Sequence, residues 1–188
     1  MGYALAKAAS ILGAKVQLVS TTKQLKVPYG VQVTYVESAL EMHDAVTQLF
    51  PKTDIAVMVA AVSDYYVANR SNQKIKKQQN ESGLMLELLE NPDILKKLGH
   101  SKREGQVVIG FAAETTNVLE YAKAKLEKKK ADVIIANDVS NSRIGFNSDS
   151  HQVTLITKDG HIVNLPKNSK EELALNIWES LIEEKIVH

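Results

Sequence analysis

Short apolar runs alternate with amphipathic segments along most of the chain. The apolar runs have the length and residue content of strands, whereas the segments between them repeat apolar residues every three or four positions, as helices do. Strands are expected at Lys15 to Ser20, Val31 to Glu37, Asp54 to Val59, Leu84 to Leu89, Gln106 to Phe111 and Asp132 to Ala136. The alternation predicts an α/β fold that is Rossmann-like, with a mostly parallel sheet and helices on both faces.

Capping patterns mark where the helices begin. Ser38 and Ser169 are each followed three residues later by a glutamate, which is a capping box. The segment Asn91-Pro92-Asp93 offers a capping side chain, a proline suited to the first turn and an acid suited to the positive end of the helix dipole. Thr115 or Thr116 is expected to cap a helix that runs to about Lys130. The residues expected on buried helical stripes are Tyr3, Leu5, Ala6, Ala9, Leu12, Met42, Ala45, Val46, Leu49, Phe50, Leu119, Ala122, Leu126, Leu173, Ala174, Ile177, Trp178, Leu181 and Ile182.

The two ends of the chain depart from simple alternation. Near the C-terminus, Val153 to Thr157 and His161 to Leu165 flank Lys158-Asp159-Gly160, which predicts an antiparallel β-hairpin at the edge of the sheet. The chain also opens directly in a helix that Gly13 is placed to end. A doubly wound domain normally begins with a strand that leads into this helix, so either that strand is missing or the sheet is built unusually.

Composition narrows the class of protein. The 188 residues, of which 44% are hydrophobic, suit a single domain over residues 1–188. A net charge of +1 argues against a broad nucleic-acid surface, and the lack of cysteine excludes disulfides and thiolate chemistry. The sequence has no apolar run of about 18 residues and no signal-peptide pattern. We therefore expect a cytoplasmic protein that binds neither nucleic acid nor membrane.

A polar stretch, Ala60 to Lys77, is the first candidate for chemistry. It follows the apolar run at Ile55 to Val59, and ligands of open α/β sheets bind beyond the carboxyl ends of the strands. Asp64 lies near its start, and Lys74 begins a basic cluster at its end. The stretch fits an anion site and a solvated surface loop equally well, since most charge runs are only solvated faces.

Other candidate groups follow predicted strands or begin predicted helices. The free N–H groups at Asn91-Pro92-Asp93 suit an anion. Phe111 could stack on a base, although a core role is commoner for phenylalanine. Lys125 and Lys129 lie one helical turn apart and could hold a polyphosphate, although a solvated face is again the simpler reading. Asn137-Asp138 ends the last buried strand, and no role is expected for Ser63 or Tyr66.

Taken in order, these segments resemble phosphopantothenoylcysteine synthetase, a family of coenzyme A biosynthesis that is often fused to a decarboxylase in bacteria. The matching segments are MGYALAKAA (1–9), AAVSDY (60–65), KIKK (74–77), NPDIL (91–95), GFAAET (110–115), ANDVS (136–140) and GFNSD (145–149). Each segment alone is a weak signal. Their shared order along nearly the whole chain is specific.

The resemblance implies a ligase reaction that uses CTP and Mg²⁺. The carboxylate of 4′-phosphopantothenate would attack the α-phosphate of CTP, and the amine of L-cysteine would then displace CMP from the acyl-cytidylate. By the family's pattern, Lys74 would lie at the reacting centre, and Asn137 and Asp138 would contact substrate. The residues that would hold the nucleotide are Ala60, Asp64, Lys74, Asn91, Pro92, Asp93, Ile94, Phe111, Lys125 and Lys129.

The resemblance also carries departures and alternatives. The family has a strand, a glycine-rich turn and an asparagine-bearing segment ahead of the position of Met1, and the sequence does not show them. Family members pair as homodimers, so a dimer is expected here. One alternative is a nicotinamide-dependent oxidoreductase of similar sheet topology, although Thr21-Thr22-Lys23 stands where its ribose-binding acid would lie. Another is an inactive fragment that binds nucleotide or dimerises.

Overall fold

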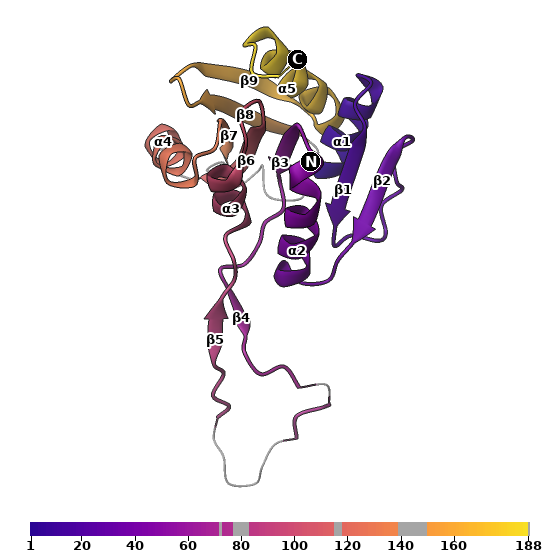
Figure 1. Cartoon of the computed structure of the whole chain (residues 1–188), viewed down its shortest axis with the longest axis vertical. Helices are drawn as coiled ribbons and strands as arrows, with labels where there is room; N and C mark the ends of the chain where they lie inside the picture. The colour runs from indigo at the N-terminus through magenta and orange to yellow at the C-terminus, as the bar shows by residue number, and fades with distance from the viewer. Residues whose placement is uncertain (72, 77–82, 115–117, 139–149, 188) are drawn as a thin grey trace.

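The computed structural model describes residues 1–71, 73–76, 83–114, 118–138 and 150–187. Figure 1 shows a layered α/β body from which a thin arm projects. The helices are α1 (Gly2–Ile11), α2 (Ala39–Leu49), the short 3₁₀ turn η1 (Phe50–Lys52), α3 (Ile94–Ser101), α4 (Val118–Lys129) and α5 (Lys170–Glu183). The strands are β1 (Val16–Ser20), β2 (Val31–Tyr35), β3 (Ile55–Met58), β4 (Tyr65–Val67), β5 (Leu88–Glu90), β6 (Val107–Glu114), β7 (Val133–Asp138), β8 (Ser150–Thr157) and β9 (Ile162–Ser169).

The main sheet has five strands in the order β3-β6-β7-β8-β9. β3, β6 and β7 are parallel, with Ile55 opposite Val107 and Ile109 opposite Val133. β8 and β9 are antiparallel and lie beyond β7, which confirms the expected C-terminal hairpin. The mostly parallel α/β class that the sequence predicts is therefore confirmed.

The sheet is divided, which the sequence did not resolve. β1 and β2 pair with each other in parallel, from Val16 opposite Val31 to Ser20 opposite Tyr35, and form a separate two-stranded sheet. Among the described residues no strand connects β1 to β3. The sequence left open a missing strand or an unusual sheet, and the described residues show a sheet in two parts in which β1 and β3 do not pair.

The projecting arm (residues 65–90, of which 72 and 77–82 lie outside the described residues) corrects one expected strand. A strand was predicted at Leu84 to Leu89, but strand pairing begins only at Leu88, where β5 lies antiparallel to β4. Its side chains are exposed rather than buried, with Met85 96% accessible. The apolar pattern could not show that this segment leaves the body of the protein (Figure 1).

Helices cover both faces of the main sheet and bury two apolar layers. One layer joins α1 and α5 to the sheet and includes Leu5, Leu173 and Ile177, each at most 3% exposed. Trp178 donates its indole N–H to the carbonyl of Leu5 at 3.1 Å and so connects the two helices. The opposite layer contains α2 and α3 and is centred on fully buried Leu98.

Most of the expected helix details are confirmed, and a few are wrong. The hydroxyls of Ser38 and Ser169 accept the amides of Glu41 and Glu172 at 3.2 Å, as the capping boxes predicted. The N-cap of α3 is Asp93 rather than Asn91. Leu12, Leu119 and Ile182 were expected on buried stripes, but they lie at stripe margins and are between 43% and 49% exposed. The expected cap at Thr115 or Thr116 lies outside the described residues.

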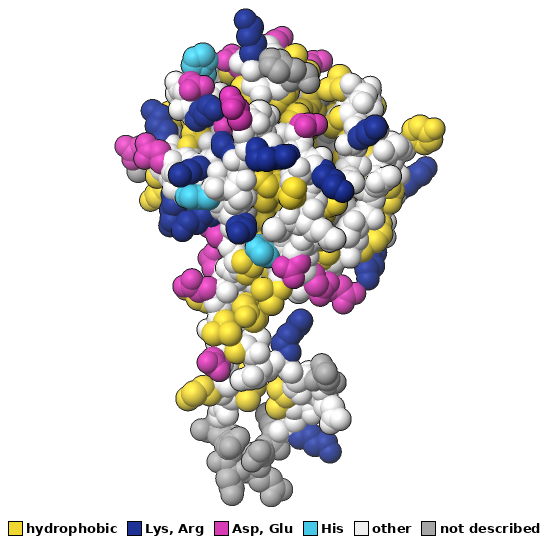
Figure 2. All heavy atoms as spheres, in the orientation of Figure 1, with side chains coloured by type: hydrophobic (Ala, Val, Ile, Leu, Met, Phe, Trp, Pro, Cys, Tyr) yellow, Lys and Arg dark blue, Asp and Glu magenta, His cyan; other side chains and the backbone are white. Residues whose placement is uncertain are grey.

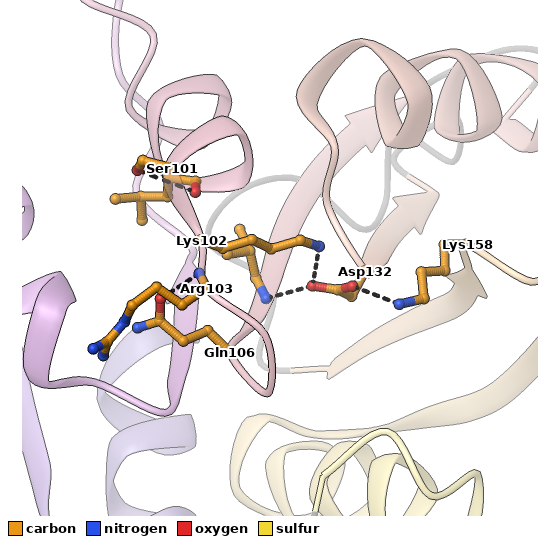
Figure 3. A network of polar contacts seen from close by, with 8 residues as sticks. Ser101, Lys102, Arg103, Gln106, Asp132 and Lys158 are labelled. Atoms are coloured by element: carbon orange, nitrogen blue, oxygen red, sulfur yellow. Dashed lines mark hydrogen bonds and ion pairs between the residues drawn. The ribbon is translucent and has the colours of Figure 1, made fainter.

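A buried carboxylate, that of Asp132, connects the amino ends of β6 and β7 (Figure 3). Asp132 is 6% exposed and accepts the amide of Val108 at 2.9 Å. Lys102 reaches one carboxylate oxygen at 2.6 Å, and Lys158 reaches the other at 3.1 Å. Burial opposes the charge of this carboxylate, but the hydrogen bonds from Lys102, Val108 and Lys158 hold the pKa of Asp132 below its ordinary value of 3.8.

We predict that Asp132→Asn lowers the free energy of unfolding by roughly 1.5–3 kcal/mol at pH 7, because charged hydrogen bonds to both lysines are lost. A depressed folded-state pKa contributes stability above the ordinary value of 3.8, and this contribution disappears as the pH falls towards the folded-state pKa. The difference between the two proteins should therefore shrink below about pH 4. Urea unfolding across pH measures it, with the exposed turn residue Asp159→Asn as control. A constant difference down to pH 2 would contradict the assignment.

Candidate functional site

The site predicted from sequence lies at the carboxyl ends of β3, β6 and β7. Because these strands are parallel, the segments that follow them meet at the same edge of the sheet. A cavity of about 2390 Å³ opens there and continues along the gap between β1 and β3. Ten of the twelve residues predicted for the site line this cavity: Ala60, Asp64, Asn91, Pro92, Asp93, Ile94, Phe111, Lys125, Lys129 and Asn137.

Asn91 fixes the two chain segments where the arm leaves the body. Its backbone amide donates to the carbonyl of Asp64 at 2.7 Å, and its side-chain amide donates to the carbonyl of Ser63 at 2.9 Å. The side-chain oxygen of Asn91 is buried and has no hydrogen-bond partner among the described residues. A buried acceptor without a partner is costly, so this oxygen is well placed to accept a hydrogen bond from a ligand. Ser63, for which no role was expected, provides the backbone contact.

Asp93 and Lys129 form an ion pair between the start of α3 and the end of α4. One carboxylate oxygen of Asp93 accepts the amide of Lys96 at 2.9 Å, and the other contacts the ammonium group of Lys129. Burial opposes the charge, but the bonds from Lys129 and the Lys96 amide outweigh it and lower the pKa of Asp93. The carboxylate is therefore ionised at neutral pH, and the charge of Lys129 is balanced within the protein.

Lys125 lies one turn before Lys129 and points to the same edge of the sheet. Its ammonium group donates to the carbonyl of Phe111 at 3.3 Å. Phe111 lines the cavity and also packs on the apolar layer of α1 and α5, so it combines the two roles that the sequence left open. The two lysines thus reach the carboxyl ends of the strands, where a phosphate chain would find both cations within one helical turn.

Gly99, which the sequence analysis did not single out, allows the close packing of α3 against the end of α4. A Cβ atom built on Gly99 would lie 1.9 Å from the carbonyl oxygen of Lys129 and 2.8 Å from that of Lys130. No side chain fits at these distances, so glycine allows the end of α4 to pack directly on α3. This contact brings Lys129 within reach of Asp93. A glycine inside a predicted helix was the available signal, since it usually has a packing reason.

The remaining predicted residues are not brought to the cavity by the described structure. Lys74 lies in the arm beyond β4, is exposed and does not line the cavity. Asp138 ends β7, and its side chain lies outside the described residues, as do Lys77 and the GFNSD segment (145–149). The roles expected for Lys74 and Asp138 stay predictions.

Two absences hold for the part of the chain that the structure describes. It contains no cluster of three or more His, Cys, Asp or Glu side chains that could bind a metal ion. Its helices are each too short or too polar to cross a membrane.

Fold and site together define an α/β domain with a cavity, lined in part by charged and amide side chains, at the carboxyl ends of its parallel strands. The sequence profile of the DNA/pantothenate metabolism flavoprotein C-terminal domain matches residues 1–185. The chain therefore belongs to this family, in agreement with the resemblance seen in its motifs.

Curated relatives and solved structures agree with this assignment. The chain is 42% identical over 182 residues to the coenzyme A biosynthesis bifunctional protein CoaBC of Bacillus subtilis. This alignment covers 96% of the chain and 44% of that relative. It is 44% identical over 174 residues to CoaBC of Vibrio cholerae, covering 93% of the chain and 43% of that relative. The chain thus spans less than half the length of these relatives.

Among solved structures, the C-terminal domain of CoaBC superposes with a TM-score of 0.78 at 39% identity, covering 96% of this chain and 79% of that one. A Cab2 variant in complex with phosphopantothenate-cysteine superposes with a TM-score of 0.60 at 16% identity, covering 84% of this chain and 56% of that one, which supports the fold alone.

The contribution of the Asp93 ion pair can be separated from that of the helix cap. Asn is as good an N-cap as Asp, so Asp93→Asn should lose only the ion pair, about 0.2–1 kcal/mol at this partly exposed site. Asp93→Ala should lose the cap as well, about a further 1 kcal/mol. Urea unfolding of both variants measures the two steps, with exposed Glu104→Gln as control. Equal stabilities of the Asn and Ala variants would contradict the capping role.

Proposed function

We propose that the chain is the phosphopantothenate–cysteine ligase part of a CoaBC-type protein, with CTP as the nucleotide. One observation carries the proposal: in a member of this family, five of the seven ordered motifs contribute residues to one cavity at the carboxyl edge of the sheet. The bifunctional CoaBC relatives support coenzyme A biosynthesis as its setting. A nicotinamide-dependent oxidoreductase has no comparable support.

The reaction would proceed in two transfers. A carboxylate oxygen of 4′-phosphopantothenate bonds to the α-phosphorus of CTP as pyrophosphate leaves. The amine nitrogen of L-cysteine then bonds to the acyl carbon of the cytidylate, loses a proton, and CMP departs. Both steps concentrate negative charge on phosphate oxygens, so positioned cations and N–H groups would supply most of the catalysis.

The cavity residues fit separate parts of that nucleotide. We assign the base and sugar to Ala60, Asp64, Phe111 and the Asn91–Ile94 turn, where the unpartnered oxygen of Asn91 offers an acceptor. A cytosine amino group is a donor of the required kind. Asn137 and Asp138 would contact substrate.

Lys125 and Lys129 would bind the phosphates. Lys129 must then exchange part of its pairing with Asp93 for the triphosphate, which carries more negative charge than a single carboxylate. The two lysines would act together because they lie one helical turn apart.

Magnesium would reach the site with the triphosphate. Mg²⁺ in nucleotide sites usually keeps several waters and takes one or two carboxylates together with phosphate oxygens. Asp64 and Asp93 are carboxylates that line the cavity, but Asp64 is assigned to the base and sugar and Asp93 pairs with Lys129, so no protein ligand is assigned to the metal. When bound with the triphosphate, Mg²⁺ would supply charge neutralisation, and Lys125 and Lys129 would hold the phosphate oxygens.

Incubation with CTP, phosphopantothenate and Mg²⁺, with and without cysteine, tests the reaction. We expect pyrophosphate in both cases, and CMP together with the ligated product only when cysteine is present. Replacing CTP by ATP tests the choice of base. Binding of CTP without release of either product would favour the non-catalytic reading of the chain and overturn the ligase proposal for it.

Lys74 is the residue to test at the reacting centre. Lys74→Gln should lower turnover by orders of magnitude, since a cation that stabilises transferred charge is lost. The unfolding free energy should change by less than about 0.5 kcal/mol because Lys74 is exposed in the arm. The matched control is Lys7→Gln on the exposed face of α1. Near-normal turnover of the Lys74 variant would refute the assignment.

We also propose that the chain forms a homodimer and that a decarboxylase accompanies it, fused as in the bifunctional relatives or as a partner. Support for the dimer comes from the arm, where Leu84, Met85, Leu86 and Leu88 are between 53% and 96% exposed, because a group of exposed apolar side chains often marks a protein contact. Figure 2 shows hydrophobic side chains gathered where the arm meets the body.

Sedimentation equilibrium should give twice the monomer mass. Leu88→Asp should shift the protein to monomer, since a charge would be buried at the contact. Ile162→Asp, at an exposed apolar position on β9, is the matched control and should leave the dimer intact. An unchanged dimer in the Leu88 variant would place the interface elsewhere.

A further inference from the structure

The helix α5 begins at the same edge of the sheet as the candidate site. β8 is antiparallel to β7 and β9 is antiparallel to β8, so β9 runs in the same direction as β7. The carboxyl end of β9 therefore lies at the edge where β3, β6 and β7 also end. Ser169 ends β9 and caps α5, which places Lys170, the first residue of α5, at this edge. Lys170 lines the same cavity as Phe111 and Asn137.

The cavity receives polar side chains from both faces of the sheet. Lys125 and Lys129 belong to α4, which covers the face of β7 that presents Ile134. Ile135 packs instead on the layer of α1 and α5. Because side chains alternate along a strand, Asn137 points to the same face as Ile135. The cations of α4 and the start of α5 thus reach the cavity from opposite faces.

Lys170 has no structural partner that accounts for its charge. Its side chain is partly buried, and its ammonium group makes no hydrogen bond or ion pair with the residues that the structure describes. The N-terminus of a helix carries partial positive charge, so a cation at this position opposes the helix dipole. The capping box of Ser169 and Glu172 forms without it. A cation that lines a cavity under these conditions is suited to an anionic ligand.

The chemistry of the proposed reaction requires a second anion site away from the nucleotide phosphates. Phosphopantothenate carries its reacting carboxylate at one end and its phosphate at the other. The carboxylate has to reach the α-phosphate of the nucleotide, whose phosphates are assigned to Lys125 and Lys129. The phosphate of phosphopantothenate must then lie on the side of the cavity away from these two lysines. Lys170 provides a cation on the opposite face of the sheet.

We propose that Lys170 binds the phosphate group of phosphopantothenate and so selects this substrate over unphosphorylated pantothenate. The inference rests on the proposed ligase function and names a residue for its second substrate. Asn137, on the same face of the sheet, would contact that substrate between Lys170 and the nucleotide. Lys170 lies away from the reacting carboxylate in this arrangement, so it orients the substrate and has no part in the chemical steps.

Comparison of phosphopantothenate with pantothenate in the Lys170→Gln variant tests the proposal. The value of kcat/KM for phosphopantothenate should fall about 10- to 100-fold, mainly through KM, because a charged hydrogen bond to the substrate is lost. Pantothenate lacks the phosphate, so the variant and the unaltered chain should use it equally. Lys170→Arg keeps the charge and should retain most of the preference for the phosphorylated substrate. The matched control is Lys167→Gln, an exposed position on β9 outside the cavity lining.

Calorimetric titration of the same proteins separates this proposal from the ligase proposal, since binding requires no turnover. Lys170→Gln should bind phosphopantothenate about 10- to 100-fold more weakly and CTP unchanged. A chain that shows this difference but forms no product would contradict the ligase proposal and leave the assignment of Lys170 supported.

Three results would overturn the assignment of Lys170: an equal loss of affinity for phosphopantothenate and pantothenate, weaker binding of CTP instead, or no binding of phosphopantothenate by the unaltered chain. Urea unfolding checks for a structural role. Lys170→Gln should be at least as stable as the unaltered chain, because it removes a cation from the positive end of a helix. A clear loss of stability would indicate a structural role and count against the proposal.

Discussion

The structure depends on the parallel pairing of β3, β6 and β7. Each strand must satisfy its backbone groups through its neighbours, and parallel pairing requires a long crossover connection between successive strands, usually a helix. α3 connects β3 to β6 at the level of the body, and α4 connects β6 to β7. Because the strands end together, every connecting segment starts at the same edge. The cavity is a consequence of this arrangement, and its polar residues come from segments distant in sequence.

Charge is distributed unequally between the two ends of these strands. At the amino ends, Asp132 is buried and held by two lysines, so it serves to fix β6 and β7. At the carboxyl ends, Asp93 and Lys129 pair at a partly exposed position next to the cavity. The ion pairs of the buried Asp132 carboxylate are costly to break, whereas the Asp93–Lys129 pair is accessible to a ligand of higher charge. The same residue types thus have a structural role at one end and, in the proposed function, a binding role at the other.

Local patterns in the sequence predicted much of this arrangement. The capping serines, the strands β1, β2, β3, β6 and β7 and the C-terminal hairpin follow from periodicity and turn residues, which act over a few positions. The divided sheet, the projecting arm and the pairing of Asn91 with Ser63 depend on contacts between distant segments. Such contacts leave little trace in a single sequence. Ten predicted site residues line one cavity because strand ends could be inferred, whereas the position of Lys74 in the arm could not.

Gly99 shows that a substitution outside the cavity lining can alter the cavity. α4 rests on α3 with its last carbonyl groups against the glycine, so the depth of this contact fixes how far Lys129 stands from the cavity. Even one methyl group would separate the two helices and displace the lysine. A position with no polar atom of its own beyond the backbone thereby controls where a lysine proposed to bind phosphate is placed.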